Sequence, residues 1–230
     1  MTGIVASTSL AELVSELMLR YESVSTNEPL HNSMGFNSDE FKLNVDVCYY
    51  GCSFTYGEGV DRNQRWTDVI DYKQGYSSNN FGIRGVCIDD ILSIFVATTK
   101  FIKMKKALFL FPDCARQTFP IYLHELKKSK FINIYPGYPT FYTDIAKTWF
   151  SLPDLFYEDK TQSAINLITH IANLNNIDLY FSSWSPTVFK LLPQDKRIKN
   201  YVPNDNLGSD GAHPGSEYHN QLAQKFIDLL

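Results

Sequence analysis

Residues 45–59 read VDVCYYGCSFTYGEG, and this stretch decides the fold. Val45–Tyr50 is a short, almost continuous apolar run that stops at Gly51, which is typical of a buried strand. A helical pattern follows around Trp66. Ser53 therefore falls on a strand-to-helix turn, where nearby backbone N–H groups suit a nucleophile whose product is an oxyanion. A purely structural glycine-rich turn would look the same, so the stretch alone leaves both interpretations open.

Short apolar runs alternate with helical periods from here to the end of the chain. Further strands are predicted at 79–81, 107–111 (ALFLF), 132–135 and 177–181 (IDLYF), and further helices at 88–96, 122–128, 161–174 and 216–229. Strands that are apolar throughout and separated by helices indicate a parallel sheet covered on both faces. The sequence thus predicts a three-layer α/β/α fold whose active site lies beyond the carboxyl ends of the strands.

The chain before residue 44 has a different character. Residues 9–21 have the period of an amphipathic helix, and residues 22–42 are polar and rich in Asn and Ser. We therefore expect an N-terminal helix with a linking loop (1–43) and a main domain (44–230). The helix is expected either to pack on the main domain or to join two copies of the chain as a homo-oligomer.

The composition excludes several classes of protein. The 230 residues carry a net charge of −4, which favours neither nucleic-acid binding nor attraction to an anionic membrane. The N-terminal residues are acidic where a signal peptide is apolar, and no run is long enough to span a membrane, so a cytoplasmic protein is expected. The cysteines at 48, 52, 87 and 114 form no C-x-x-C pair, which favours buried free thiols and no metal site.

A second informative stretch lies just before the last predicted helix and reads Asp210-Gly211-Ala212-His213-Pro214. Two acid–base residues three positions apart on a tight turn can point the same way. His213 can then act as a general base while Asp210 holds its tautomer and stabilises the imidazolium. A helix-capping Asp beside a surface histidine is the alternative for this stretch taken alone.

Together the two stretches resemble the SGNH (GDSL-like) hydrolases. That family has Gly-Asp-Ser after its first strand and Asp-x-x-His before its last helix; here Cys52 stands where Asp is usual. The resemblance covers residues 44–230 and implies a flavodoxin-like sheet of about five parallel strands. It also implies Ser53 as the nucleophile, with His213 and Asp210 completing a catalytic triad, and no cofactor.

The middle blocks of the family match less closely. Gly85 best matches the glycine whose N–H, together with that of Ser53, forms the oxyanion hole. The third block normally supplies an oxyanion-binding Asn after the third strand, but the nearest position here holds Asp113. An ionised carboxylate cannot donate a hydrogen bond to an oxyanion and would repel it. Arg116 is a candidate substitute, a neutralising partner for Asp113, or a binder of an anionic substrate group.

The resemblance implies a serine-dependent ester hydrolase that removes a small acyl group, such as acetyl, from a carbohydrate or similar alcohol. Asp113, Arg116 and Tyr56 are the candidate substrate-binding residues. Trp184 is expected to pack in the core, and contact with the substrate is the alternative. Transfer of the acyl group to another alcohol would use the same triad. The missing Asn also motivates a non-catalytic binding or assembly module. A nucleotide-binding protein fits poorly, because no Gly-Lys-Ser/Thr follows the turn.

Overall fold

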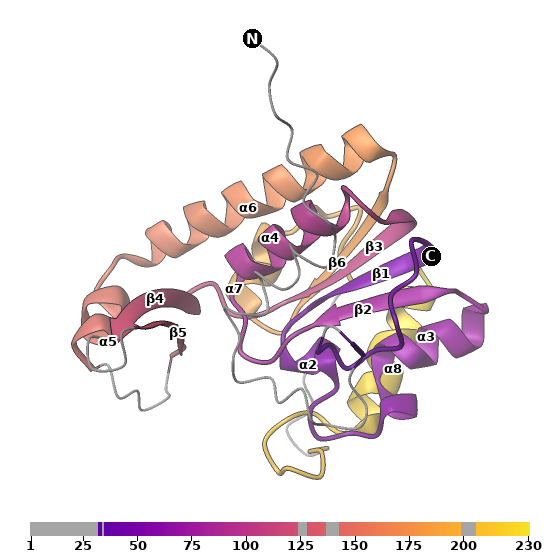
Figure 1. Ribbon diagram of the computed structural model, residues 1–230, viewed down its shortest axis with the longest axis horizontal. Coiled ribbons are helices and arrows are strands. Elements are labelled where there is room, and N and C mark those ends of the chain that lie inside the picture. Colours follow the sequence, from indigo (N-terminus) through magenta and orange to yellow (C-terminus); the bar gives the residue numbers. More distant parts are fainter. Residues whose placement is uncertain (1–31, 34, 124–127, 137–142, 199–205) are drawn as a thin grey trace.

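The computed structural model of the chain describes residues 32–33, 35–123, 128–136, 143–198 and 206–230 (Figure 1). The amphipathic helix expected at 9–21, and the homo-oligomer through it, lie outside these residues. The centre of the molecule is a parallel sheet with strand order β2-β1-β3-β6. Its strands are β1 (Asn44–Gly51), β2 (Ser78–Gly82), β3 (Lys103–Phe111) and β6 (Asp178–Ser183).

Helices cover both faces of this sheet, which confirms the predicted α/β/α layering (Figure 1). On one face lie α4 (Ile88–Thr98), α6 (Asp154–Asn175) and α7 (Pro186–Leu191), and on the other α3 (Trp66–Gln74) and α8 (Ser216–Ile227). Alternate side chains of each strand enter the two cores, so Tyr50 faces α4 while Tyr49 faces α3. Burial on both faces explains why these strands read as continuous apolar runs.

A row of aromatic rings crosses all four strands just before their carboxyl ends. Phe81 of β2 stacks on Tyr50 of β1, and Tyr50 stacks on Phe109 of β3 with ring centroids 4.9 Å apart. Phe181 of β6 continues the row, with its ring centroid 5.5 Å from that of Phe109. The register of the strands places these residues opposite one another, so the row stiffens the end of the sheet that carries Ser53.

Directly after the aromatic row, two glycines face each other across β1 and β2. Gly51 and Gly82 are register partners, and the short helix α2 (Ser53–Tyr56) lies on them. A methyl group on Gly82 would overlap the backbone nitrogen of Tyr56, and one on Gly51 would overlap the side chain of Thr55. The two glycines therefore let the Ser53 turn pack directly against the sheet.

The described part of the predicted linking loop packs on the main domain. Phe36 is 2% exposed and belongs to the hydrophobic core. The side chain of Asn37 donates to the backbone oxygen of Tyr56, and buried Arg65 donates to the backbone oxygens of Asn37 and Tyr56. Residues 36–38 thus help hold α2 in place rather than serving only as a linker.

The main difference from the prediction lies between β3 and α6. The strand expected at 132–135 exists as β5 (Lys128–Ile134), but it pairs antiparallel with β4 (Gln117–Leu123) in a separate hairpin, next to α5 (Thr143–Phe150). The parallel sheet therefore has four strands among the described residues, not about five. The helix expected at 122–128 is wrong at 122–123 and at 128, which are strand, and the residues between them lie outside the described part of the chain. The alternation of apolar and other residues with a period of two over 117–123 was an available signal for a strand. Two antiparallel strands can hydrogen-bond to each other, so they need not join the main sheet.

Within the described part of the chain, no helix is long and apolar enough to cross a membrane.

We predict that Gly82→Ala lowers the free energy of unfolding by about 3 kcal/mol, because the added methyl has to displace backbone rather than a movable side chain. Gly75→Ala is the control. Gly75 ends α3 with a positive φ, and a methyl there meets nothing within 4 Å, so only about 1 kcal/mol for the left-handed backbone is expected. Urea unfolding of both variants measures the difference, and equal losses would contradict close packing of α2 on the sheet.

A second prediction concerns His219, which is 0% exposed and accepts the backbone N–H of Trp66 through Nδ1. Burial, with the nearby charges of Arg65 and His213, lowers the pKa of His219 to about 4. The pKa of this histidine in the unfolded chain is 6.5. Between the two pKa values only the unfolded chain binds the proton, so the free energy of unfolding falls as the pH falls through this window.

The wild type should therefore lose about 2 kcal/mol more than His219→Asn between pH 7 and pH 5, since Asn does not titrate. Urea unfolding of both proteins at the two pH values measures this difference, in which other titrating groups cancel. Parallel losses in the two proteins would show that His219 is not held neutral by burial.

Candidate active site

Ser53 is the first residue of α2 and lies at the carboxyl end of β1, as expected from the strand-to-helix turn. It is 7% exposed. As the first helical residue, it has a backbone N–H without a partner inside the helix, directed to the same side as the helix N-terminus. The side-chain amide of Asn80 donates to the backbone oxygen of Thr55 and so fixes the turn from the side of β2.

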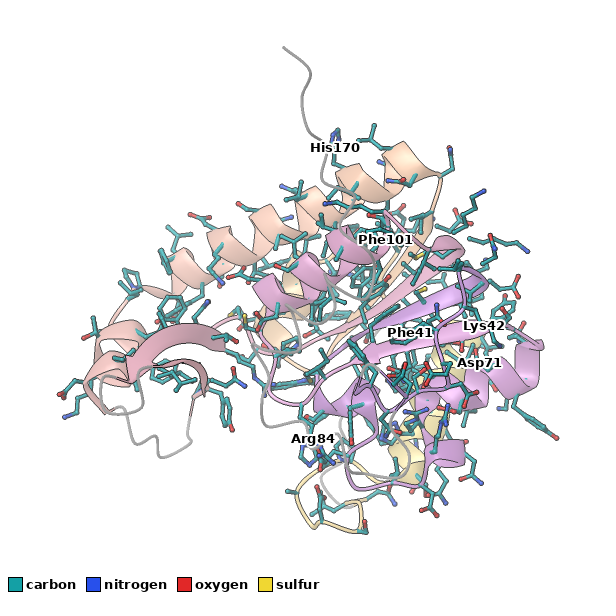
Figure 2. All side chains as sticks on the ribbon, in the orientation of Figure 1. Phe41, Lys42, Asp71, Arg84, Phe101 and His170 are labelled. Atoms are coloured by element: carbon teal, nitrogen blue, oxygen red, sulfur yellow. The ribbon has the colours of Figure 1, made fainter. Side chains whose placement is uncertain are left out.

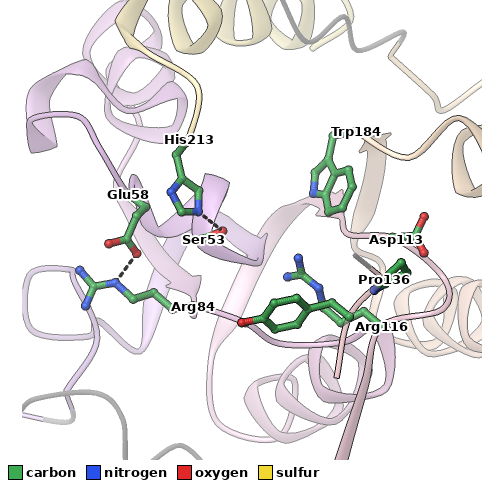
Figure 3. A pocket seen from close by; sticks show the side chains of 10 residues that line it. Ser53, Glu58, Arg84, Asp113, Arg116, Pro136, Trp184 and His213 are labelled. Atoms are coloured by element: carbon green, nitrogen blue, oxygen red, sulfur yellow. Dashed lines mark hydrogen bonds and ion pairs between the residues drawn. The ribbon is translucent and has the colours of Figure 1, made fainter. Parts of the chain in front are cut away.

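The structure brings the three predicted triad residues together. The Nε2 atom of His213 lies 3.0 Å from Oγ of Ser53, and its Nδ1 atom lies 2.5 Å from Oδ2 of Asp210 (Figure 3). The first of these contacts joins residues 160 positions apart in the sequence. An Nδ1–H that donates to Asp210 leaves Nε2 unprotonated and able to accept the hydroxyl proton of Ser53.

Asp210 is held in the ionised form by its own turn. Partial burial by itself would raise its pKa, but the backbone N–H groups of His213 and Ala212 and the imidazole of His213 outweigh this effect. Both N–H groups donate to Oδ1 at 3.0 Å, and the pKa of Asp210 falls to about 2. The carboxylate is therefore charged at neutral pH and orients the imidazole.

The turn that carries Asp210 and His213 docks on the loop that follows α2. The backbone N–H of Ser209 donates to the oxygen of Gly59 at 2.7 Å. A methyl group on Gly59 would lie 2.8 Å from Oδ1 of Asp210, and the φ of Gly59 is 81°. The last glycine of the opening motif thus allows the close approach that places Asp210 and His213 beside Ser53.

A cavity of about 440 Å³ opens beside Ser53 and His213 (Figure 3). Gly85, the predicted oxyanion residue, lines it with a φ of 75°, in the loop between β2 and α4. The amide nitrogen of Asn133 from β5 packs against this glycine. Gly85 and Ser53 therefore line the same cavity.

Asp113 and Arg116 also line the cavity, but they do not pair with each other among the described residues. The Oδ2 atom of Asp113 accepts the hydroxyl of Ser185 at 2.8 Å, and Oδ1 accepts the N–H of Ala115 at 2.9 Å. Figure 3 shows this carboxylate on the side away from Ser53, whereas the guanidinium of Arg116 points toward Ser53. Asp113 therefore neither replaces the family's Asn as a donor nor faces the nucleophile directly.

Tyr56 does not contact the cavity. It is 5% exposed, and the guanidinium of Arg84 lies over its ring, 4.2 Å from the centroid. Arg84 faces the cavity instead and pairs there with Glu58. In Figure 2, Arg84 lies at the α2 end of the molecule, far from His170 on α6.

Of two aromatic side chains that line the cavity, the sequence suggested Trp184 as a substrate contact but did not indicate Tyr135. Tyr135, directly after β5, and Trp184, directly after β6, line the cavity. Trp184 also packs on the core, as predicted. Its position one residue beyond the carboxyl end of a parallel strand was a usable signal, whereas Tyr135 follows β5, a strand that was predicted to join the parallel sheet and not a hairpin.

The described residues contain no group of three or more His, Cys, Asp or Glu side chains able to hold a metal ion. The four cysteines are buried and free, as the sequence predicted. Cys52, at the position where the family has Asp, is 0% exposed and precedes Ser53 as the residue before α2.

No family model matches this chain, and no curated protein matches it by sequence. Its structure is similar to a protein from Desulfitobacterium hafniense assigned to the lipolytic G-D-S-L family, with a TM-score of 0.52 and 13% identity, over 82% of this chain and 100% of that one. A solved structure of TesA matches with a TM-score of 0.52 and 13% identity, over 80% and 97% of the two chains. The chain therefore has the α/β fold of the G-D-S-L (SGNH) lipolytic proteins.

Proposed function

We propose that this protein is a serine-dependent ester hydrolase. The observation that supports this most is the continuous chain of contacts from Ser53 through His213 to Asp210 at the edge of a cavity. The three residues also occur along the chain in the order that the SGNH resemblance implies. Ser53 lies at the carboxyl end of β1, where the active site of such an α/β fold is expected.

In the proposed reaction, Oγ of Ser53 attacks the ester carbonyl carbon while its proton passes to Nε2 of His213. The tetrahedral intermediate collapses by breaking the carbon–oxygen bond to the alcohol, which leaves with the proton from His213. Water then attacks the acyl-enzyme, again giving its proton to His213. The bond to Ser53 breaks, the serine regains its proton, and a carboxylic acid is released. Asp210 stays ionised throughout and stabilises the imidazolium.

The oxyanion is held by the backbone N–H groups of Ser53 and Gly85. The position at which the SGNH resemblance implies a third donor holds Asp113, whose oxygens already accept two hydrogen bonds. Because one oxyanion donor typically contributes about 10²–10³ in turnover, we expect a slow enzyme unless the substrate recruits another donor.

The substrate is proposed to be a small acyl ester, such as an acetyl ester of a carbohydrate or similar alcohol. A cavity of about 440 Å³ admits a group of this size. Transfer of the acyl group to a second alcohol instead of water would proceed through the same acyl-enzyme.

The first prediction of this proposal is covalent labelling. A fluorophosphonate probe should modify Ser53, and Ser53→Ala and His213→Ala should abolish the adduct, because an unactivated serine does not react. Mass spectrometry of peptides locates the adduct, and circular dichroism shows that the variants are folded. Absence of labelling in the folded wild type would reject the triad and favour a non-catalytic binding module.

The second prediction tests whether Asp210 orients His213, separately from the nucleophilic role of Ser53. Asp210→Asn should lower kcat/KM for 4-nitrophenyl acetate about 10⁴-fold, because an amide that donates to Nδ1 favours the wrong tautomer of His213. The amide oxygen can still accept the two backbone N–H groups that shape the turn. Asp195→Asn, an exposed residue outside the cavity, is the matched control and should retain wild-type kcat/KM. A loss of tenfold or less in Asp210→Asn would argue against the proposed role of Asp210.

A further inference from the structure

Two residues that line the Ser53 cavity each carry a buried hydrogen-bond donor that has no partner in the part of the chain that the structure describes. These donors are Nε of Arg116 and Nε1 of Trp184. Buried donors are nearly always satisfied in folded proteins, so orphaned donors on two residues of one cavity indicate a ligand that supplies the acceptors. This pair lies across the cavity from His213 (Figure 3).

Among the described residues, the charge of Arg116 also has no carboxylate partner. The one hydrogen bond that its side chain makes to these residues is long, at 3.5 Å, from Nη1 to the backbone oxygen of Val86. The other cavity arginine, Arg84, is neutralised by Glu58, and Asp113 is engaged by Ser185 and Ala115.

Arg116 is held rigidly in spite of this. Its guanidinium carbon lies 5.1 Å from the ring centroid of Tyr135 and 5.5 Å from that of Trp184. Two aromatic faces thus fix the guanidinium plane and restrict its hydration. A planar guanidinium of fixed orientation favours a planar, bidentate acceptor, and a carboxylate has that geometry.

We propose that Arg116, assisted by Nε1–H of Trp184, binds a carboxylate of the substrate, so that the enzyme selects esters that also carry an acidic group. This inference rests on the proposed ester hydrolase and names its substrate class. The acidic group belongs to either half of the ester, such as an acylated sugar acid or a half-ester of a dicarboxylic acid. The net charge of −4 disfavours anions in general, so such selectivity has to come from this local site.

The test compares anionic esters with their uncharged methyl esters. One pair, 3-acetoxybenzoate and methyl 3-acetoxybenzoate, carries the acid on the alcohol half. The other, mono-4-nitrophenyl succinate and its methyl ester, carries it on the acyl half. The wild type should show a higher kcat/KM for the anionic member of at least one pair. Arg116→Met should lower the anionic-to-neutral ratio of that pair about 10- to 100-fold, and Trp184→Phe should lower it several-fold.

Two variants serve as controls. Arg116→Lys, which keeps the charge but loses the planar fork, should retain part of the preference. Arg197→Met removes an arginine that lies over Phe189 and donates to its backbone oxygen, outside the cavity, and should leave the ratio at the wild-type value. A wild-type ratio of one or less in both pairs, or a ratio unchanged in Arg116→Met, would overturn the proposal.

A binding experiment tests the carboxylate site independently of the proposal that the protein is a hydrolase. If neutral esters are not hydrolysed and Ser53 is not labelled, the catalytic proposal fails. Calorimetry on Ser53→Ala then decides the carboxylate site alone. Binding of 3-acetoxybenzoate at least tenfold tighter than its methyl ester, lost in Ser53→Ala/Arg116→Met, supports the site, and equal binding of the two compounds rejects it.

Discussion

The close approach of the α2 turn to the ends of β1 and β2 is the constraint on which the candidate site depends. Two glycines facing each other across the strands leave room for it, and any side chain at Gly82 would meet backbone. Asn80 and Arg65 then fasten the turn from two sides by donating to its carbonyl oxygens. Ser53 thus has little freedom of its own, and the turn that carries His213 is brought to it through Gly59.

The parts of the fold that were predictable are those with a uniform environment. β1, β3 and β6 are buried on both faces over most of their length, so each contains a run of apolar residues that marks it as a strand. The triad was predictable because a short motif carries its local geometry: the Asp210 turn satisfies its own carboxylate through neighbouring N–H groups.

The rest of the site could not be predicted because its geometry comes from tertiary contacts. β4 and β5 pair with each other in a hairpin, and nothing in the sequence indicates that these two strands stand apart from the parallel sheet. For the same reason, Tyr56 was assigned to the substrate although Arg84 covers it. Arg116 forms no ion pair with Asp113, because this carboxylate instead accepts the hydroxyl of Ser185, which is 72 positions away in the sequence.

The hairpin has a consequence for how this protein can change over evolutionary time. Gly51 and Gly82, on which the Ser53 turn packs, lie in the sheet directly after the aromatic row from Phe81 to Phe181, where most substitutions disturb packing. Tyr135, by contrast, follows a hairpin that pairs outside the parallel sheet. One wall of the cavity can therefore diversify while the reacting groups stay unchanged, which makes the hairpin the natural place for new selectivity to arise by mutation.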